Sequence, residues 1–341
     1  MFSVQPISVK ETILFPALFG LGRLLPFGWL KKASALPVLP LYHAVSERPS
    51  PYVEHVGVWR STQQFKADLD FLLKHYEPVG LEDLLAGRKT KRPPLHLTFD
   101  DGLAECYTTV FPLLKARGIP ATFFVNSAFV DNKSLFFRFK ASLIIGKVQA
   151  DPKAMQVFRA WLQKQKISTG WQEFLLSVRY GGRTVLEEAA RELDIDFAGC
   201  LKQRPCYMSM DELQQLEKAG FTIGAHSIDH PRYDALPLDE QIRQTVESLD
   251  FVSRHFHPPA RTFAFPFTDF GAGRNFFDEL EQKAACSLSF GCAGLKRDAA
   301  PKHLQRIPFD ENQFTARSNL SKEYLYFLLK APLGRNVLRR N

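Results

Sequence analysis

The sequence predicts an α/β fold, with either a parallel sheet covered by helices or a (β/α) barrel. Beyond residue 35, short apolar runs typical of buried strands alternate with stretches whose apolar residues recur at helical spacing. Repeated strand–helix units of this length favour those two architectures. The alternation stops over residues 131–207, where we predict a helical insertion. The length of 341 residues allows two domains, and it equally allows one barrel of roughly 250 residues with an addition.

The part before the insertion contains three predicted strands and two predicted helices. Ser61 or Thr62 is the expected N-cap of the first helix, and Gly118 ends the second. The pair Pro93-Pro94 precedes the second strand and marks its start. In chain order, the elements are a strand at 36–42, a helix at 62–76, a strand at 95–99, a helix at 104–117 and a strand at 121–125.

The strand–helix alternation resumes after the insertion. Ser209 and Glu212 have the spacing of a capping box, which predicts the start of a helix that ends at Gly220. The elements that follow are a strand at 221–225, a helix at 238–256, a strand at 261–266, a helix at 274–284 and a strand at 286–292.

The composition indicates a globular protein with an excess of positive charge. The 44 Lys and Arg outnumber the 36 Asp and Glu, which favours anionic surroundings such as headgroups or acidic glycans. No basic stripe with interleaved aromatic residues is present, so we expect no nucleic-acid partner. The five cysteines are odd in number and form no CxxC pair. They are best interpreted as free thiols in a reducing compartment.

The N-terminal segment is apolar but interrupted. Residues 13–30 contain Pro16, Arg23 and Pro26, whereas a spanning helix needs about 20 apolar residues without such breaks. Two interpretations remain for residues 13–32, namely peripheral membrane contact followed by Lys31 and Lys32, or a packed arm. We expect a cytoplasmic protein, or one at the inner face of the membrane, rather than a secreted one.

Four predicted strands end in polar or catalytic residue types. His43 follows the first strand, Asp100 and Asp101 the second, His226 and His230 the strand at 221–225, and Pro266-Phe267-Thr268 the strand at 261–266. In parallel α/β folds these ends share one rim, where active sites lie. One carboxylate and two imidazoles suit a divalent transition metal with positions open for substrate. The adjacent carboxylate is then available to handle protons.

These motifs resemble those of the polysaccharide deacetylases, the NodB homology or carbohydrate esterase 4 family. Leu97-Thr98-Phe99-Asp100-Asp101-Gly102, followed by Gly118 to Phe124, is similar to the first motif of that family. His226-Ser227-x-x-His230 matches the second, and Phe265-Pro266-Phe267 resembles the third. The resemblance covers roughly residues 36–130 and 208–310. It implies a distorted (β/α) barrel of the NodB type, here with the helical insertion.

The resemblance also implies an activity, which is metal-dependent removal of N-acetyl groups, or with less support O-acetyl groups, from a carbohydrate. Asp100 matches the general base, and Asp101, His226 and His230 match the ligands of one divalent ion. Zinc is expected, with cobalt or nickel as alternatives. The backbone N–H of Phe267 matches an oxyanion donor, and the neighbouring Pro266 and Thr268 are expected to bind substrate.

The general acid departs from the usual family pattern, which has a late Leu-x-His motif. His303 is the only late histidine, but Leu39-Pro-Leu-Tyr42-His43 resembles a rearranged branch in which the first strand brings the acid. We therefore favour His43 over His303. Arg306 is expected to pair with Asp100 and keep this base ionised.

The domain boundaries follow from these motifs. We expect an apolar arm at 1–35, a NodB-like domain at 36–320 with the insertion at about 131–207, and a basic tail at 321–341. Two other functions remain open. One is a glycosidase that uses Asp100 with Asp229 or Asp269, and the other is a glycan-binding relative without catalytic activity.

Overall fold

A computed structural model describes residues 25–168, 170–310 and 312–340. Its centre is an eight-stranded sheet in which neighbouring strands pair in parallel, in the order β12-β10-β9-β8-β7-β6-β1-β13. The strands are β1 (Pro40–Tyr42), β6 (Leu97–Phe99), β7 (Ala121–Val125), β8 (Thr222–Ala225), β9 (Thr262–Ala264), β10 (Leu288–Gly291), β12 (His303–Gln305) and β13 (Ile307–Pro308).

The two ends of the sheet belong to one stretch of chain. β12 pairs with β10 and β13 pairs with β1, and only Arg306 separates β12 from β13. This stretch therefore joins both edges and closes the sheet into a distorted barrel, which confirms the predicted fold class. The strands predicted from the sequence end at residue 292 and do not include His303, which begins β12 in the structure.

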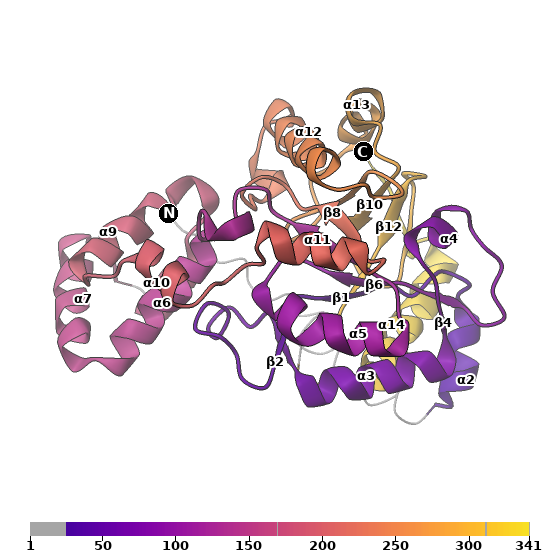
Figure 1. Cartoon of the computed structure of the whole chain (residues 1–341), viewed down its shortest axis with the longest axis horizontal. Coiled ribbons are helices and arrows are strands. Elements are labelled where there is room, and N and C mark those ends of the chain that lie inside the picture. Colours follow the sequence, from indigo (N-terminus) through magenta and orange to yellow (C-terminus); the bar gives the residue numbers. More distant parts are fainter. Residues whose placement is uncertain (1–24, 169, 311, 341) are drawn as a thin grey trace.

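Helices cover the outside of the barrel (Figure 1). Ser61 caps the N-terminus of α3, and Ser209 forms a complete capping box with Glu212 at the start of α11. Gly118 ends α5 with a φ of 61°, as predicted. The helices outside the insertion are α2 (Phe27–Leu30), α3 (Thr62–His75), α4 (Leu81–Leu85), α5 (Phe111–Arg117), α11 (Met210–Lys218), α12 (Leu238–His255), α13 (Arg274–Ala284) and α14 (Ala316–Lys330).

Short two-stranded sheets tie the loops to this frame. They pair β2 (Ala44–Ser46) with β3 (Trp59–Ser61), β4 (Glu77–Pro78) with β5 (Pro94–Leu95), and β11 (Arg297–Asp298) with β14 (Val337–Leu338).

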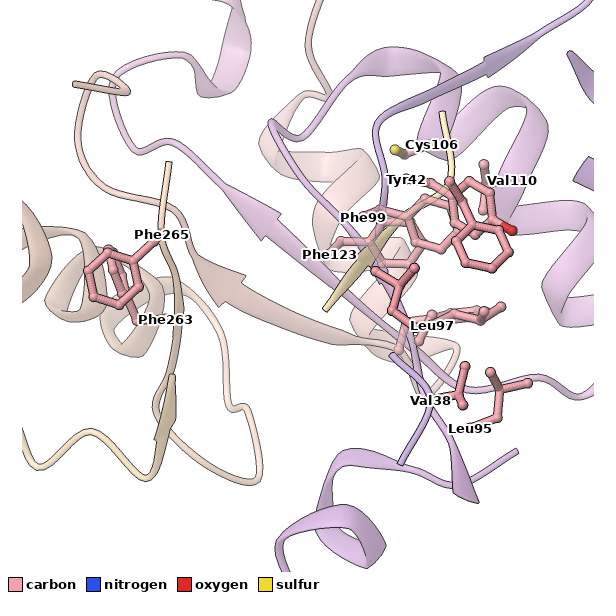
Figure 2. Close-up of a cluster of buried hydrophobic side chains, with 14 of the residues drawn as sticks. Val38, Tyr42, Leu95, Leu97, Phe99, Cys106, Val110, Phe123, Phe263 and Phe265 are labelled. Carbon is pink, nitrogen blue, oxygen red and sulfur yellow. The ribbon is translucent and has the colours of Figure 1, made fainter. Parts of the chain in front are cut away.

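Aromatic residues fill much of the core (Figure 2). The ring of Phe99 stacks on Tyr42 and on Phe123, with centroids 5.6 and 5.0 Å apart, so β1, β6 and β7 share one aromatic layer. Phe263 and Phe265 belong to the same cluster but lie apart from this layer, with their ring centroids 5.1 Å from each other. Burial of such rings is the main favourable contribution to holding the strands together.

The predicted insertion is helical and stands to one side of the barrel (Figure 1). An isolated bridge between Leu103 and Tyr207 is the only strand-like pairing within its described residues. Its helices share a hydrophobic cluster with Ala44, Tyr52 and Leu103, which lie in segments that follow the barrel strands β1 and β6, so it is packed onto the rim. They are α6 (Phe137–Ala150), α7 (Pro152–Lys164), α8 (Trp171–Ser177), α9 (Thr184–Glu192) and α10 (Phe197–Gln203).

The two terminal regions can be compared in part with the predicted arm at 1–35 and the predicted tail at 321–341. Most of the arm at 1–35 lies outside the described residues, so membrane contact through residues 13–32 stays a prediction. The part that is described packs on the barrel, with Phe27 and Leu30 buried. The tail predicted at 321–341 is not separate, because α14 crosses residue 320 and buries Leu325 and Phe327. No described helix has the length and apolar character to cross a membrane.

Candidate active site

Asp100 and Asp101 follow β6 at the barrel rim, in a turn that departs from extended geometry. Asp101 and Gly102 have φ values of 69° and 64°, a region that side chains with a Cβ rarely adopt. A Cβ at residue 102 would lie 3.0 Å from Cγ1 of Val125, so the turn needs glycine there. The turn brings both carboxylates close to His226, although neighbouring side chains on an extended strand diverge.

His226 and His230 follow β8 in a tight turn and not in a helix. Ser227 and His230 have φ values of 69° and 62°. The Ser227 hydroxyl accepts the N–H of His230 at 3.0 Å, and the Asn126 amide donates to the carbonyl of His226. These contacts hold the two imidazoles together, with ring centroids 4.9 Å apart.

The predicted ligand atoms converge as a metal site requires. His226 Nε2 and His230 Nε2 lie 3.5 and 3.2 Å from Asp101 Oδ1. Atoms bound to one ion at about 2.1 Å lie roughly 3.4 Å apart in a tetrahedral arrangement. Asp101 Oδ1 and His226 Nε2 are buried without a hydrogen-bond partner among the described residues, a cost that an ion would remove. The residues therefore fit a divalent metal.

The surroundings of His226 favour its ligand form. The Nδ1 of His226 lies 2.8 Å from the carbonyl oxygen of Ala264, which places the proton on Nδ1 and leaves the Nε2 lone pair toward Asp101. Burial lowers the pKa of His226 to about 4. The imidazole is therefore neutral at pH 7, as metal binding needs.

Arg306 closes the barrel and also pairs with Asp100, as the sequence predicted. Its two terminal nitrogens donate to Asp100 Oδ1 at 2.6 Å and Oδ2 at 2.8 Å, and both side chains are almost fully buried. Burial alone would raise the pKa of Asp100, but the guanidinium holds it below its usual value. Since Arg306 occupies both oxygens of Asp100, Asp101 is the better placed of the two carboxylates to bind metal.

Removal of Arg306 should therefore destabilise the protein strongly. Arg306→Ala leaves the Asp100 carboxylate buried without its partner, and we expect the free energy of unfolding to fall by about 3–5 kcal/mol. Urea-induced unfolding measures this change. The matched control is Arg243→Ala, which breaks an exposed helical ion pair and should cost no more than about 1 kcal/mol. Equal losses in the two variants would contradict the prediction.

His43 follows β1 and faces the same rim. Its Nδ1 lies 2.6 Å from Asp310 Oδ2 and its backbone N–H donates to Asp310 Oδ1. Burial lowers the pKa of His43, but the charge and the hydrogen bond of Asp310 outweigh this effect and raise it to about 9. Its Nε2 has no hydrogen-bond partner among the described residues and is free to act on a ligand.

His303, the other histidine considered as the acid, does not line the cavity that His43, Asp100 and Asp101 share. Its buried ring contacts the Ser289 hydroxyl at 2.8 Å and Asp269 Oδ2 at 3.0 Å. Asp269 also accepts from Arg340 and Gln305. This network joins the C-terminal strand β14 to the barrel, and both nitrogens of His303 are occupied within it.

Phe267 lies in a strained turn after β9, with a φ of 56°. The Cys292 thiol donates to the carbonyl of Phe267 at 2.9 Å, and no described residue accepts the N–H of Phe267. This N–H is thus available to a ligand. Pro266 and Thr268, which we expected to bind substrate, belong to the same turn but do not line the cavity beside it.

A cavity of about 320 Å³ brings these groups together. Asp100, Asp101, His230, His43 and Phe267 line it, together with residues of the insertion and of the loop at 56–58. The insertion thus forms part of the wall. The carboxylates required by the glycosidase alternative are elsewhere, since neither Asp229 nor Asp269 lines this cavity. Asp229 accepts from Tyr180 and Gln244 instead.

Two charged residues of this cavity, Asp310 and Arg138, were not predicted from the sequence. Asp310 follows β13, which pairs with β1, so the rule of shared strand ends would have placed it near His43 once that strand was recognised. Arg138, at the start of α6, also lines the cavity. No motif marked it, because only the packing of the insertion brings it to the rim.

Comparisons with known proteins agree with this architecture. A family model described as polysaccharide deacetylase matches residues 87–279, whereas no curated protein gives a significant match. The deacetylase PplD of Streptococcus pyogenes, solved in complex with acetate, has a TM-score of 0.53 and 13% identity over 84% of this chain and 97% of its own. IcaB from Ammonifex degensii has a TM-score of 0.52 and 19% identity over 84% of this chain and 97% of its own. A de-N-acetylase from Aggregatibacter actinomycetemcomitans has a TM-score of 0.52 and 16% identity over 83% of this chain and 99% of its own. At these identities the structures show a shared fold.

Proposed function

We propose that this chain, which belongs to the polysaccharide deacetylase family, hydrolyses N-acetyl groups of a carbohydrate with the help of one divalent metal ion. The observation that carries the proposal is the cluster of Asp101, His226 and His230 beside the Asp100–Arg306 pair, with His43 lining the same cavity. A carboxylate base and a histidine acid in one cavity suit hydrolysis of an amide.

Asp101, His226 and His230 would hold the ion. When bound, a divalent ion supplies Lewis-acid chemistry, because it polarises a carbonyl and makes water more acidic. Zinc fits one carboxylate and two imidazoles, and cobalt and nickel accept the same donor types.

The remaining steps belong to residues of the chain. Asp100 is kept ionised by Arg306 and takes a proton from the attacking water. The N–H of Phe267 donates a hydrogen bond to the oxygen that gains negative charge as the carbonyl becomes tetrahedral. His43 then protonates the departing nitrogen through Nε2, while Asp310 holds the ring through Nδ1 and favours its charged form.

The His43–Asp310 pair favours an N-acetyl over an O-acetyl substrate. An amine leaves an amide only after its nitrogen is protonated, so the reaction needs a positioned acid. The alkoxide that leaves an ester depends less on such an acid. A histidine whose pKa is raised to about 9 is protonated at neutral pH, as amide hydrolysis requires.

Acetate release from a panel of N-acetylated and O-acetylated glycans tests the proposal. We expect release from an N-acetylated glycan, loss of activity after treatment with a chelator, and recovery when Zn²⁺ or Co²⁺ is added. Full activity in the chelated, metal-free protein would contradict metal dependence. Preferential release from O-acetylated glycans would contradict the proposed amide specificity.

The metal content of purified variants tests the ligand set directly. We expect about one divalent ion per chain in the wild type and a large loss in His230→Ala, because the site keeps only two donors. His257→Ala is the matched control, since this side chain is 95% exposed and lies outside the cavity. Elemental analysis of folded protein provides the measurement. Equal metal in all three proteins would exclude His230 as a ligand.

A further inference from the structure

Arg138 is a cationic side chain in the wall of the active-site cavity that the proposed reaction does not use. It belongs to the first turn of α6, within the insertion, and lines the cavity. Its guanidinium carbon lies 5.0 Å from the ring centroid of Phe267, and that ring lies 4.6 Å from the ring of His230. Arg138 therefore stands one aromatic ring away from a candidate metal ligand.

The charge of Arg138 has no acidic partner among the described residues. No hydrogen bond or ion pair joins it to another described side chain, and its Nε is buried without a partner. Burial, with a smaller contribution from Arg232, lowers its pKa. A guanidinium that is partly removed from water carries a cost unless an anion compensates it.

The other charged groups of the cavity are already matched. Asp100 pairs with Arg306 and Asp310 with His43, while Asp101 belongs to the candidate metal cluster. Arg232, the arginine near Arg138, pairs with Asp234. Arg138 is thus the cationic side chain of the cavity that has no acidic partner among the described residues, and an anion on a ligand would compensate its charge.

We propose that Arg138 binds a carboxylate on the sugar next to the N-acetylated one, so that the substrate is an acidic glycan. This inference rests on the proposed deacetylase function. A guanidinium held over an aromatic ring keeps its N–H edge available, and its fork matches a carboxylate with two parallel hydrogen bonds. Phe267 separates Arg138 from the reacting groups, which assigns the carboxylate to a neighbouring sugar and not to the acetylated one.

A pair of matched substrates tests this inference. The first is an oligosaccharide of alternating N-acetylglucosamine and glucuronic acid, and the second is the same oligosaccharide with its carboxylates converted to methyl esters. For the wild-type, metal-loaded enzyme we expect kcat/KM to be about ten- to a hundredfold higher on the acid, the range of charge-assisted hydrogen bonds. The difference should lie mainly in KM.

Variants separate recognition of the anion from a structural role of Arg138. Arg138→Gln should remove the preference for the acid and leave hydrolysis of the ester close to that of the wild type, whereas Arg138→Lys should keep part of the preference. The matched control Arg232→Gln should keep it in full, because that charge is already paired. Equal losses on both substrates in Arg138→Gln would show that the side chain only supports Phe267, and would overturn the inference.

The failure of this inference can be told apart from failure of the proposed function. Wild-type enzyme that hydrolyses acid and ester equally, or only neutral N-acetylglucosamine oligosaccharides, would overturn the acidic substrate and leave the deacetylase function intact. Absence of acetate from acidic and neutral glycans alike, with metal bound, would contradict the deacetylase function itself.

Discussion

Asp100→Asn is expected to keep the bound metal and to lose about 10²–10⁴-fold in turnover, the contribution of a positioned acid–base group. The substitution preserves the shape of the side chain but removes its ability to take a proton. Both carboxylate oxygens accept hydrogen bonds from Arg306, so Asp100 is the residue that Arg306 keeps ionised and not the one left open for a ligand.

Asp101→Asn is the matched control for this experiment. Its Oδ1 is the atom that His226 and His230 both approach, so we expect it to lose metal and activity together. Metal content and acetate release would be measured on both variants, after circular dichroism has shown that they are folded. Loss of metal in Asp100→Asn with retention in Asp101→Asn would mean that the two roles are reversed.

His43→Ala should also keep its metal and lose at least about 10²-fold in turnover on an N-acetylated substrate. His43 lines the cavity and its Nε2 is free, whereas both ring nitrogens of His303 are occupied outside it. His303→Gln is therefore the matched comparison. We expect this variant to be less stable but to have near-normal turnover per folded molecule. Near-normal turnover in folded, metal-loaded His43→Ala would exclude His43 as the acid.

The pH profile gives an independent test of His43. The acid must be protonated, so the rate falls as the pH rises through its pKa, which Asp310 raises to about 9. A bound divalent cation would lower this value, which places the alkaline limb at or below pH 9. Asp310→Asn removes the carboxylate and should move the limb toward the ordinary value of about 6.5. An unchanged limb in Asp310→Asn would assign it to another group.

The raised pKa of His43 also determines how the stability of the fold depends on pH. Because the folded-state pKa of His43 lies above its unfolded value, the ion pair with Asp310 stabilises the fold fully below about pH 6.5. That contribution disappears as the pH rises through about 9. We therefore expect the difference in stability between wild type and Asp310→Asn to shrink between these values.

Local patterns in the sequence determined most of the strands, the helix caps and the position of the rim residues. Ser61, the Ser209–Glu212 pair and Gly118 act on groups within a few residues of themselves, so the sequence alone predicts the helix ends that they form. The residues that follow the buried strands at 95–99 and 221–225 were likewise predicted to share one rim, because parallel strands point their carboxyl ends the same way.

The strands β12 and β13 were not predicted from the sequence, because charged residues interrupt their short apolar pattern. His303 and Arg306 are almost fully buried, although such residue types usually indicate a surface segment. Their burial depends on Asp269 and Asp100, which lie 34 and 206 residues away in the chain. No local pattern reveals partners at such a separation.

The sequence by itself predicted strand–helix units of an α/β fold, the helical insertion and the polar residues at the strand ends, because these follow from periodicity and from motifs contiguous along the chain. The resemblance of those motifs to the deacetylase family then implied the barrel, the base and the ligands. Only the tertiary structure showed that Arg306 joins both edges of the sheet and that Asp310 contacts the imidazole of His43. It also showed that Arg138 lines the cavity without an acidic partner among the described residues. The physical reason is that hydrogen bonds and charge pairing depend on distances of a few ångströms between segments far apart in the chain, which folding alone brings together.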